Sequence, residues 1–82
     1  MTHEEIVEKV NEFLVDDLEI DGDKIRPEAM LKEEVGIDSL DLVDIIVIVN
    51  RIFGFKIEKT ELKDLKTLNQ FYDYIDAKVN HA

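Results

Sequence analysis

The chain has 82 residues, no cysteine, and 20 acidic against 10 basic side chains, which give it a formal net charge of −10. This length predicts one domain over residues 1–82, with a compact core but no roomy catalytic cleft, and the lack of cysteine excludes disulfides and thiolate metal sites. Such a charge argues against binding to nucleic acid, whose phosphates would repel the protein, and favours basic protein partners.

The first predicted element is an amphipathic helix from Thr2 or His3 to Leu18, in which apolar residues recur at helical spacing. A long connection follows, from Glu19 to Asp38. Apolar side chains placed at intervals should hold this loop on the core: Ile20, Ile25, Ala29, Leu31 and Val35. A loop of this length in so small a domain is often functional.

Residues 39–53 are rich in β-branched side chains, which favour strand, but their periodicity favours a helix. A strand would need burial on both faces, and the chain has no other convincing strand to provide it. In a helix, successive side chains are rotated by about 100°, and the side chains that lie within an arc of about 120° form a face directed at the core. That face consists of Leu42, Ile45, Ile46, Val49, Ile52 and Phe53.

The opposite side of this helix combines apolar and acidic residues. Leu40, Val43 and Val47 form an exposed apolar stripe there, with Asp41 and Asp44 close to it. We call these five residues the docking face, because an apolar stripe beside acidic side chains on an exposed surface is typical of a contact with a partner protein. Ile48 and Arg51 are expected around it.

Two further helices are predicted after Gly54. Thr60 to Leu65 can form a short one, with Thr60 as its N-cap. A longer one begins near Thr67 and carries core residues at helical spacing: Leu68, Phe71, Tyr72, Ile75 and Val79. The fold class is therefore all-α, with three main helices, one short helix and a long first loop.

The sequence also argues against secretion and membrane insertion. It has no basic segment followed by an apolar core and a cleavage site. Its longest uninterrupted apolar run, Ile45 to Val49, is far below the roughly 18 residues that a bilayer-spanning helix needs. We expect a protein of the cytoplasm without a membrane span, and a monomer.

Ser39 is the only serine of the chain and stands at the predicted start of a helix. It can be an N-cap, because serine and aspartate are preferred there. A built-in catalytic serine would need a base, and the chain offers only His3 and His81, both at termini expected to fray. A helix N-terminus also suits a phosphate group. Ser39 is therefore either a cap or a residue that another enzyme modifies.

The residues around Ser39 resemble those of the acyl carrier proteins. The segment 36–44, with the sequence GIDSLDLVD, is similar to the family's 4′-phosphopantetheine attachment motif, in which Asp38 and Leu40 flank the serine. The similarity extends over nearly the whole chain, from Val10 in the first helix to Ile75 in the last.

The resemblance implies a carrier without enzymatic activity, folded as a four-helix bundle, in which Ser39 carries 4′-phosphopantetheine derived from coenzyme A. A phosphopantetheinyl transferase would attach this arm with the help of magnesium, and its thiol would hold acyl groups as thioesters in fatty-acid or specialised polyketide or lipid biosynthesis. The implied partners are this transferase and acyl-processing enzymes with basic docking patches. The implied lining of an acyl pocket is Leu42, Ile45, Ile46, Val49 and Leu62.

Several departures from the family pattern leave the pathway open. Asn50 and Arg51 stand where many fatty-acid carriers have acidic residues, and the region of the short helix carries Lys59, Lys63 and Lys66. A housekeeping fatty-acid carrier and a specialised carrier are both compatible with the sequence. A D-alanyl carrier is also compatible, and a peptidyl carrier less so.

A rival functional interpretation concerns residues 17–28. Acidic residues at loop positions one, three, five, seven and twelve, with Gly22 at six, approximate an EF-hand calcium loop after a helix. Lys24 at position eight and Pro27 near the expected second helix depart from that pattern. A small acidic calcium-binding or interaction protein is therefore the alternative to a carrier, although a solvated acidic loop is the simpler explanation.

Overall fold

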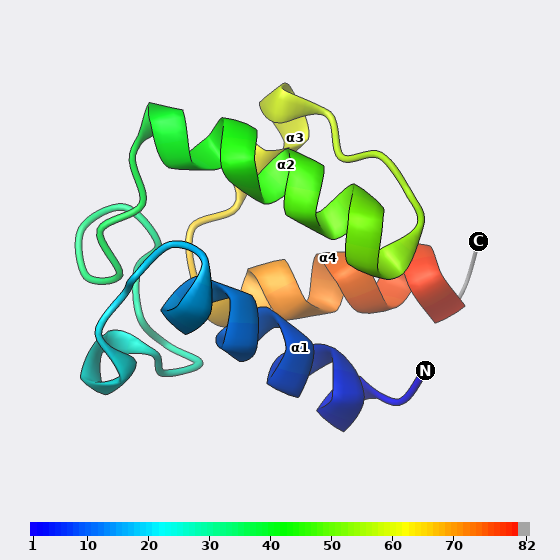
Figure 1. Cartoon of the computed structure of the whole chain (residues 1–82), viewed down its shortest axis with the longest axis horizontal. Helices are drawn as coiled ribbons and strands as arrows, with labels where there is room; N and C mark the ends of the chain where they lie inside the picture. Colours follow the sequence, from blue (N-terminus) through cyan, green and yellow to red (C-terminus); the bar gives the residue numbers. More distant parts are fainter. Residues whose placement is uncertain (81–82) are drawn as a thin grey trace.

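The computed structural model describes residues 1–80, so that His81 lies outside the described part of the chain. Four α-helices follow one another in Figure 1: α1 (His3–Asp16), α2 (Ser39–Phe53), α3 (Lys59–Asp64) and α4 (Leu68–Asn80), with a short 3-10 helix, η1 (Gly22–Lys24), in the first loop. Residues 1–80 contain no strand, and the all-α fold class is confirmed. None of the helices in this range combines the length and apolar character that a membrane crossing would require.

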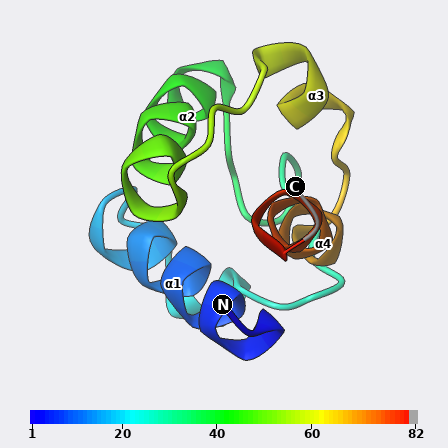
Figure 2. The same ribbon diagram turned by 90° about the vertical axis from the view of Figure 1, so that its right-hand side faces the viewer.

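The long helices form a bundle around one core. Helix α1 packs against α4, and α2 packs against α3. Figure 2, which looks along the bundle, shows α1, α2 and α4 around the centre, with α3 between the ends of α2 and α4. Inside the bundle the rings of Phe13 and Phe71 meet edge to face, with centroids 6.4 Å apart. Aromatic side chains at this spacing gain a favourable contact beyond the area they bury.

Helix α1 begins as predicted and ends earlier than predicted. Thr2 is its N-cap, because the Thr2 hydroxyl accepts from the N–H of Glu5 and the Glu5 carboxylate accepts from the N–H of Thr2. The expected end at Leu18 is wrong, since the helix stops at Asp16 and the chain reverses through Glu19, which has a left-handed φ of 56°. The apolar period continues past the helix because Leu18 still packs on the core from this turn.

The first loop is held on the core as expected. Ala29, Leu31 and Val35 are buried, while Ile20 and Ile25 are partly buried against the core. Backbone hydrogen bonds also tie the loop to the chain around the start of α4: the N–H of Leu31 donates to the carbonyl of Lys66, and the N–H of Leu68 donates to the carbonyl of Ala29. Through these bonds the loop lies against the segment between α3 and α4.

The rival EF-hand interpretation of residues 17–28 is wrong in its architecture. Residues 17–28 leave α1, but the next α-helix begins only at Ser39, so no helix–loop–helix unit forms. Asp21 instead caps η1, its carboxylate accepting from the N–H of Asp23. In the described range, no three acidic or histidine side chains gather in a way that could hold a metal ion.

The two C-terminal helices differ slightly from their predicted starts. Helix α3 begins at Lys59, so Thr60 lies inside its first turn and is not the N-cap; Glu58 holds that position without a side-chain cap bond. The start of α4 is better capped, because the Thr67 hydroxyl accepts from the N–H of Gln70 and the Gln70 side chain accepts from the N–H of Thr67. The predicted start near Thr67 is confirmed.

Candidate functional site

Ser39 is the first residue of α2, and the residue before it is the cap. The Asp38 carboxylate accepts from the N–H groups of Leu40 and Asp41, each at 3.0 Å, and the Asp41 carboxylate accepts from the N–H of Asp38 at 3.2 Å. The first alternative for Ser39, that it serves as the cap, is therefore wrong. Because Asp38 performs the capping role, the Ser39 hydroxyl is free for another one.

The chain approaches Ser39 through a turn that fixes the start of α2. Gly36 has a φ of 87°, a conformation that glycine adopts without the penalty that other residues incur. Ile37, which follows, is buried, and its N–H donates to the carbonyl of Leu31 at 2.9 Å. Ile37 thus anchors the backbone immediately before the cap, while the Ser39 side chain stays exposed. No described residue is hydrogen-bonded to the Ser39 hydroxyl.

Ser39 opens onto a groove of about 820 Å³ between the first loop, the start of α2 and the region of α3. Its lining combines apolar and charged side chains. The apolar members are Met30, Leu31, Ile37, Leu42, Leu62 and Leu65. The charged members are Lys32, Glu33, Asp38, Lys63 and Lys66. An elongated group attached at Ser39 would find an apolar wall and a charged rim beside it.

The residues expected to line an acyl pocket divide into two groups. Leu42 and Leu62 line the groove together with Ser39. Ile45 and Val49 lie in the closed core, and Ile46 packs partly buried against it, so these three do not line the groove in this conformation. The groove also contains Met30, Leu31, Ile37 and Leu65, which sequence reasoning did not assign to it. The only signal for Ile37 was its position between Gly36 and Asp38.

His3, the histidine within the described residues, is not placed to act as a base for Ser39. The Nδ1 atom of His3 lies 2.9 Å from the Asp76 carboxylate, and its ring meets Tyr72 edge to face, so His3 is held between α1 and α4 and the expectation of a frayed residue is wrong. Figure 1 places the start of α1 and the start of α2 at opposite sides of the molecule. His3 is therefore not in a position to deprotonate Ser39, and His81 lies outside the described residues.

The apolar stripe of the docking face is exposed as predicted. Leu40, Val43 and Val47 are 77%, 49% and 60% exposed, so the apolar stripe faces solvent along α2. Asp44 is exposed, whereas Asp41 is half-buried and its carboxylate accepts from the N–H of Asp38 in the cap of α2. One expectation is wrong: Ile48 does not lie around this face but is 6% exposed in the core. The fully buried face of α2 is displaced toward Ile48, because Leu42, Ile46, Ile52 and Phe53 are only partly buried.

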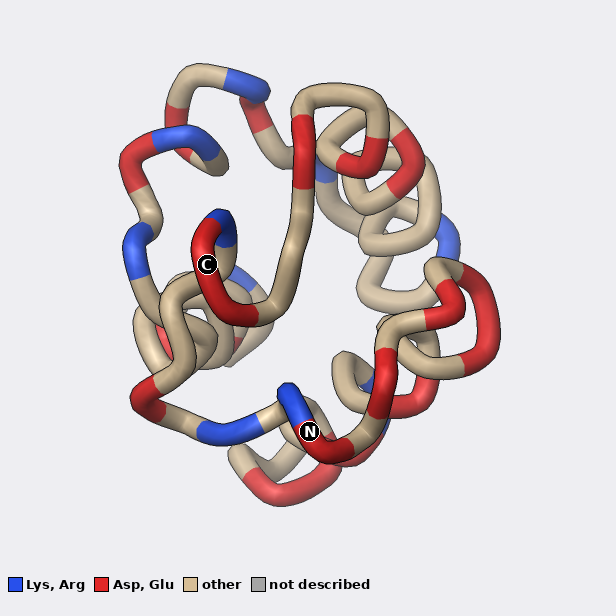
Figure 3. The backbone as a smooth tube through the Cα atoms, turned by 90° about the vertical axis from the view of Figure 1, so that its left-hand side faces the viewer, with Lys and Arg blue, Asp and Glu red and all other residues tan. Residues whose placement is uncertain are grey.

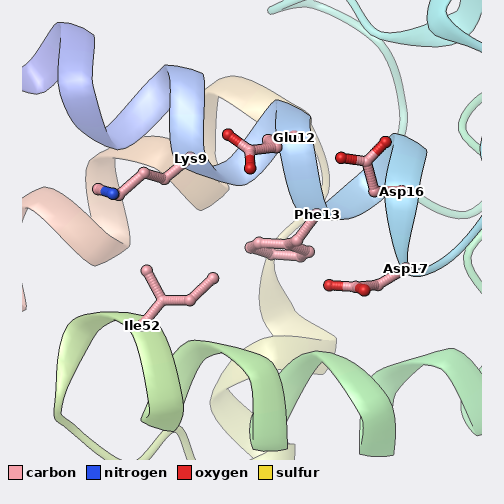
Figure 4. A pocket seen from close by; sticks show the side chains of 6 residues that line it. All are labelled: Lys9, Glu12, Phe13, Asp16, Asp17 and Ile52. Atoms are coloured by element: carbon pink, nitrogen blue, oxygen red, sulfur yellow. The ribbon is translucent and has the colours of Figure 1, made fainter.

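A second, smaller hollow lies between α1 and α2 and carries the opposite charge. It has a volume of about 270 Å³, and Figure 4 shows Phe13 and Ile52 facing each other across it. Glu12, Asp16 and Asp17 form its acidic rim, with Lys9 as the single basic side chain. The hollow has no nucleophile, and its acidic rim would disfavour a phosphate or a carboxylate.

The sequence is similar to known carriers along almost its entire length. Residues 8–75 match a family model described as "Phosphopantetheine attachment site". A protein named acyl carrier protein from Thermosynechococcus vestitus is 39% identical, over 96% of this chain and 98% of its own. Proteins of the same name from Petrotoga mobilis and Rubrobacter xylanophilus are each 36% identical, over 98% and 92% of this chain and 94% and 93% of their own.

Proposed function

The chain belongs to the acyl carrier protein family, and we propose on this premise that Ser39 is the residue that bears its covalent 4′-phosphopantetheine arm. As a member of that family the protein is a carrier and not an enzyme. One observation supports the choice of Ser39 above others: its exposed hydroxyl, released from capping by Asp38, stands at the mouth of the groove between α2 and α3.

The start of α2 suits the chemistry of attachment. The Ser39 hydroxyl gives up its proton to the transferase and forms an Oγ–P bond, while adenosine 3′,5′-bisphosphate leaves coenzyme A. The first turn of a helix favours the resulting negative charge through its dipole, although Asp38 already occupies two of the free N–H groups. We expect the transferase to supply the base that takes this proton.

The arm supplies a thiol to a chain that has no cysteine, and acyl groups are held on that thiol as thioesters. The groove beside Ser39 gives such acyl groups a place to shelter, with Leu42 and Leu62 in its wall. Ile45, Ile46 and Val49 lie behind that wall and would join the lining if the core opened around a longer acyl chain. We assign the carrier to fatty-acid or polyketide and related lipid biosynthesis in the cytoplasm.

The partners in this proposal are the transferase and acyl-processing enzymes that bear basic patches. The docking face on α2 begins beside Ser39, so an enzyme that reaches the arm also meets Leu40, Val43 and Val47. Asp44 adds an exposed negative charge to that contact. The carrier is proposed to act as a monomer, because these residues must stay accessible to successive enzymes.

Mass spectrometry tests the assignment of Ser39. The purified chain is incubated with coenzyme A, magnesium and a broad-specificity phosphopantetheinyl transferase, and its intact mass is measured. We expect one phosphopantetheine on the parent and none on Ser39→Ala. The matched control is Thr60→Ala, which removes an exposed hydroxyl from the first turn of α3 and should be modified like the parent. Modification of a folded Ser39→Ala variant would refute the proposal.

A further inference from the structure

The groove beside Ser39 gathers positive charge in a protein of opposite overall sign. Three lysines, Lys32, Lys63 and Lys66, line it, although the chain has twice as many acidic as basic residues. In the hollow between α1 and α2 the balance is reversed, with one lysine against three carboxylates. In Figure 3, blue segments recur among red ones at the upper left of the tube, on the side of α3.

The ammonium groups of the three lysines form no ion pair within the described residues. The ion pairs of residues 1–80 join His3 to Asp76 and Arg26 to Glu34, and neither involves a lysine of the groove. Of the two carboxylates that share the lining, Asp38 is bound to the N–H groups of α2. Glu33 is the second carboxylate, so three ammonium groups face two carboxylates in the groove. The groove therefore holds an excess of unpaired ammonium groups above an apolar wall.

We propose that Lys32, Lys63 and Lys66 form a binding site for an anionic group carried on the arm at Ser39. This inference rests on the proposed function and deepens it. The arm offers two sources of anionic oxygen: its own phosphodiester next to Ser39, and a carboxylate at the far end of an acyl group. Either would be attracted by the three exposed ammonium groups.

The same arrangement favours a class of cargo. An acyl group without charge gains only from the apolar wall, whereas an acyl group that ends in a carboxylate meets both the wall and the lysines. The lysines have long stems that cover apolar surface while the ammonium groups stay at the rim, so the two contacts are compatible. The groove is thus suited to acyl chains with an acidic end as well as to the phosphodiester at its mouth.

Nuclear magnetic resonance of loaded carriers tests this inference. The transferase is used to attach three arms from the corresponding coenzyme A thioesters or coenzyme A itself: the bare arm, a butyryl arm and a succinyl arm, which ends in a carboxylate. Each is attached to the parent, to Lys63→Gln/Lys66→Gln and to the matched control Lys56→Gln/Lys59→Gln. The control removes the same charge from exposed positions that do not line the groove.

Two results would support the site and identify its source. If the lysines bind the phosphodiester, the phosphorus signal of the bare arm shifts in Lys63→Gln/Lys66→Gln and stays in place in the control. If they bind the acyl end, the pKa of the succinyl carboxyl group is lower in the parent than in Lys63→Gln/Lys66→Gln, and the control matches the parent. Added salt should reduce either difference, because screening weakens exposed charge pairs.

The inference would be overturned if the phosphorus shifts and the succinyl pKa were the same in the parent and in both double variants. It would also be overturned if both variants changed these values equally, because such a change would reflect net charge alone. Measurement of the intact mass distinguishes a failure of this inference from a failure of the proposed function. If the chain gains the arm but shows none of these shifts, only the lysine site is refuted. A chain that gains no arm refutes both. Circular dichroism checks folding, and Lys66→Gln alone, outside α3, is measured if the double variant loses helicity.

Discussion

Asp38 and Asp41 bind each other's backbone across the first turn of α2. The carboxylate of Asp38 accepts from the N–H of Asp41 at 3.0 Å, and the carboxylate of Asp41 accepts from the N–H of Asp38 at 3.2 Å. Ser39 lies between them, so its backbone is fixed on both sides while its hydroxyl takes no part in the cap. This arrangement holds the proposed attachment point in place without consuming its reactive group.

The reciprocal cap predicts that Asp38 matters more for stability than Ser39. Asp38→Ala should lower the free energy of unfolding by about 0.5–2 kcal/mol, the usual cost of losing an N-cap side chain. Asp38→Asn keeps a capping oxygen and should cost less, and Ser39→Ala should cost less than Asp38→Ala because its hydroxyl caps nothing. Urea denaturation of the three variants measures these differences. Equal losses for Ser39→Ala and Asp38→Ala would contradict the assignment of the cap.

A second prediction concerns the turn before the cap. Gly36→Ala should destabilise the protein by roughly 1–2 kcal/mol, because the φ of 87° puts an L side chain in the left-handed region. The space around Gly36 is open, so the cost comes from the backbone and not from a clash. Gly22→Ala is the control, since Gly22 has equally open surroundings and no positive φ. A similar loss for both variants in thermal unfolding would show that the strain argument is wrong.

Periodicity was enough to predict α2, and it failed only at the margins. The spacing of Ile45 and Val49 outweighed the strand preference of their β-branched side chains, and both are buried on one face of a helix. The position of Ile48 is predicted wrongly because the buried face of α2 extends beyond the predicted arc on the side of Ile48. Aspartate and serine both favour the N-cap position, so residue type does not decide between Asp38 and Ser39. The choice depends on the residue at which helical backbone angles begin, and that is seen only in the structure.

The groove could not be predicted from the sequence for a different reason. It exists because the first loop is bound to the chain before α4 through backbone groups, such as the N–H of Leu31 and the carbonyl of Lys66. Such bonds leave no side-chain pattern. The sequence identified Leu42 and Leu62 only through family resemblance, and no pattern in it indicated that Lys32 would line the same groove as Lys63 and Lys66.

Net charge predicts a dependence of stability on salt. A charge of −10 on 82 residues repels itself at neutral pH, and screening weakens that repulsion. We expect the melting temperature to rise between dilute and near-physiological salt, and a gain of about 1 kcal/mol would raise it by roughly 4–8 °C in a domain of this size. Magnesium and calcium should act alike. A sharp preference for calcium would instead revive an ordered metal loop at residues 17–28.

Tyrosine burial predicts a loss of stability at alkaline pH. Desolvation raises the pKa of Tyr72 to about 12, while its hydroxyl donates to Asn11; the unfolded value is about 10. Desolvation, followed by the hydrogen bond to Glu61, likewise raises the pKa of Tyr74 to about 12. Because the folded pKa is higher, these residues favour the folded state fully below about pH 10, and this contribution falls as the pH rises toward about 12.

Denaturation at a series of pH values, with tyrosinate absorbance as a second readout, measures this effect. Tyr72→Phe should be less stable than the parent near neutral pH, because Asn11 loses its partner, but its stability should decline less steeply through the alkaline range. Tyr74→Phe should also flatten the decline. A slope unchanged in both variants would mean that other groups, such as the lysines, govern alkaline unfolding.

The docking face predicts that charge and apolar area act on different rate constants. Asp44→Asn should mainly slow association with the transferase and reduce the salt dependence of that rate, because exposed charges steer encounters more than they hold complexes. Asp44 is a better probe than Asp41, whose substitution would also disturb the cap of α2.

Leu40→Ala should instead speed dissociation, because it removes apolar area from the interface. A weakening of binding by about 1.4 kcal/mol corresponds to a tenfold faster dissociation rate. Val47→Ala should act in the same direction. Stopped-flow binding with each variant, checked for folding by circular dichroism, separates the two effects, and rates like the parent's in all of them would show that the transferase binds elsewhere.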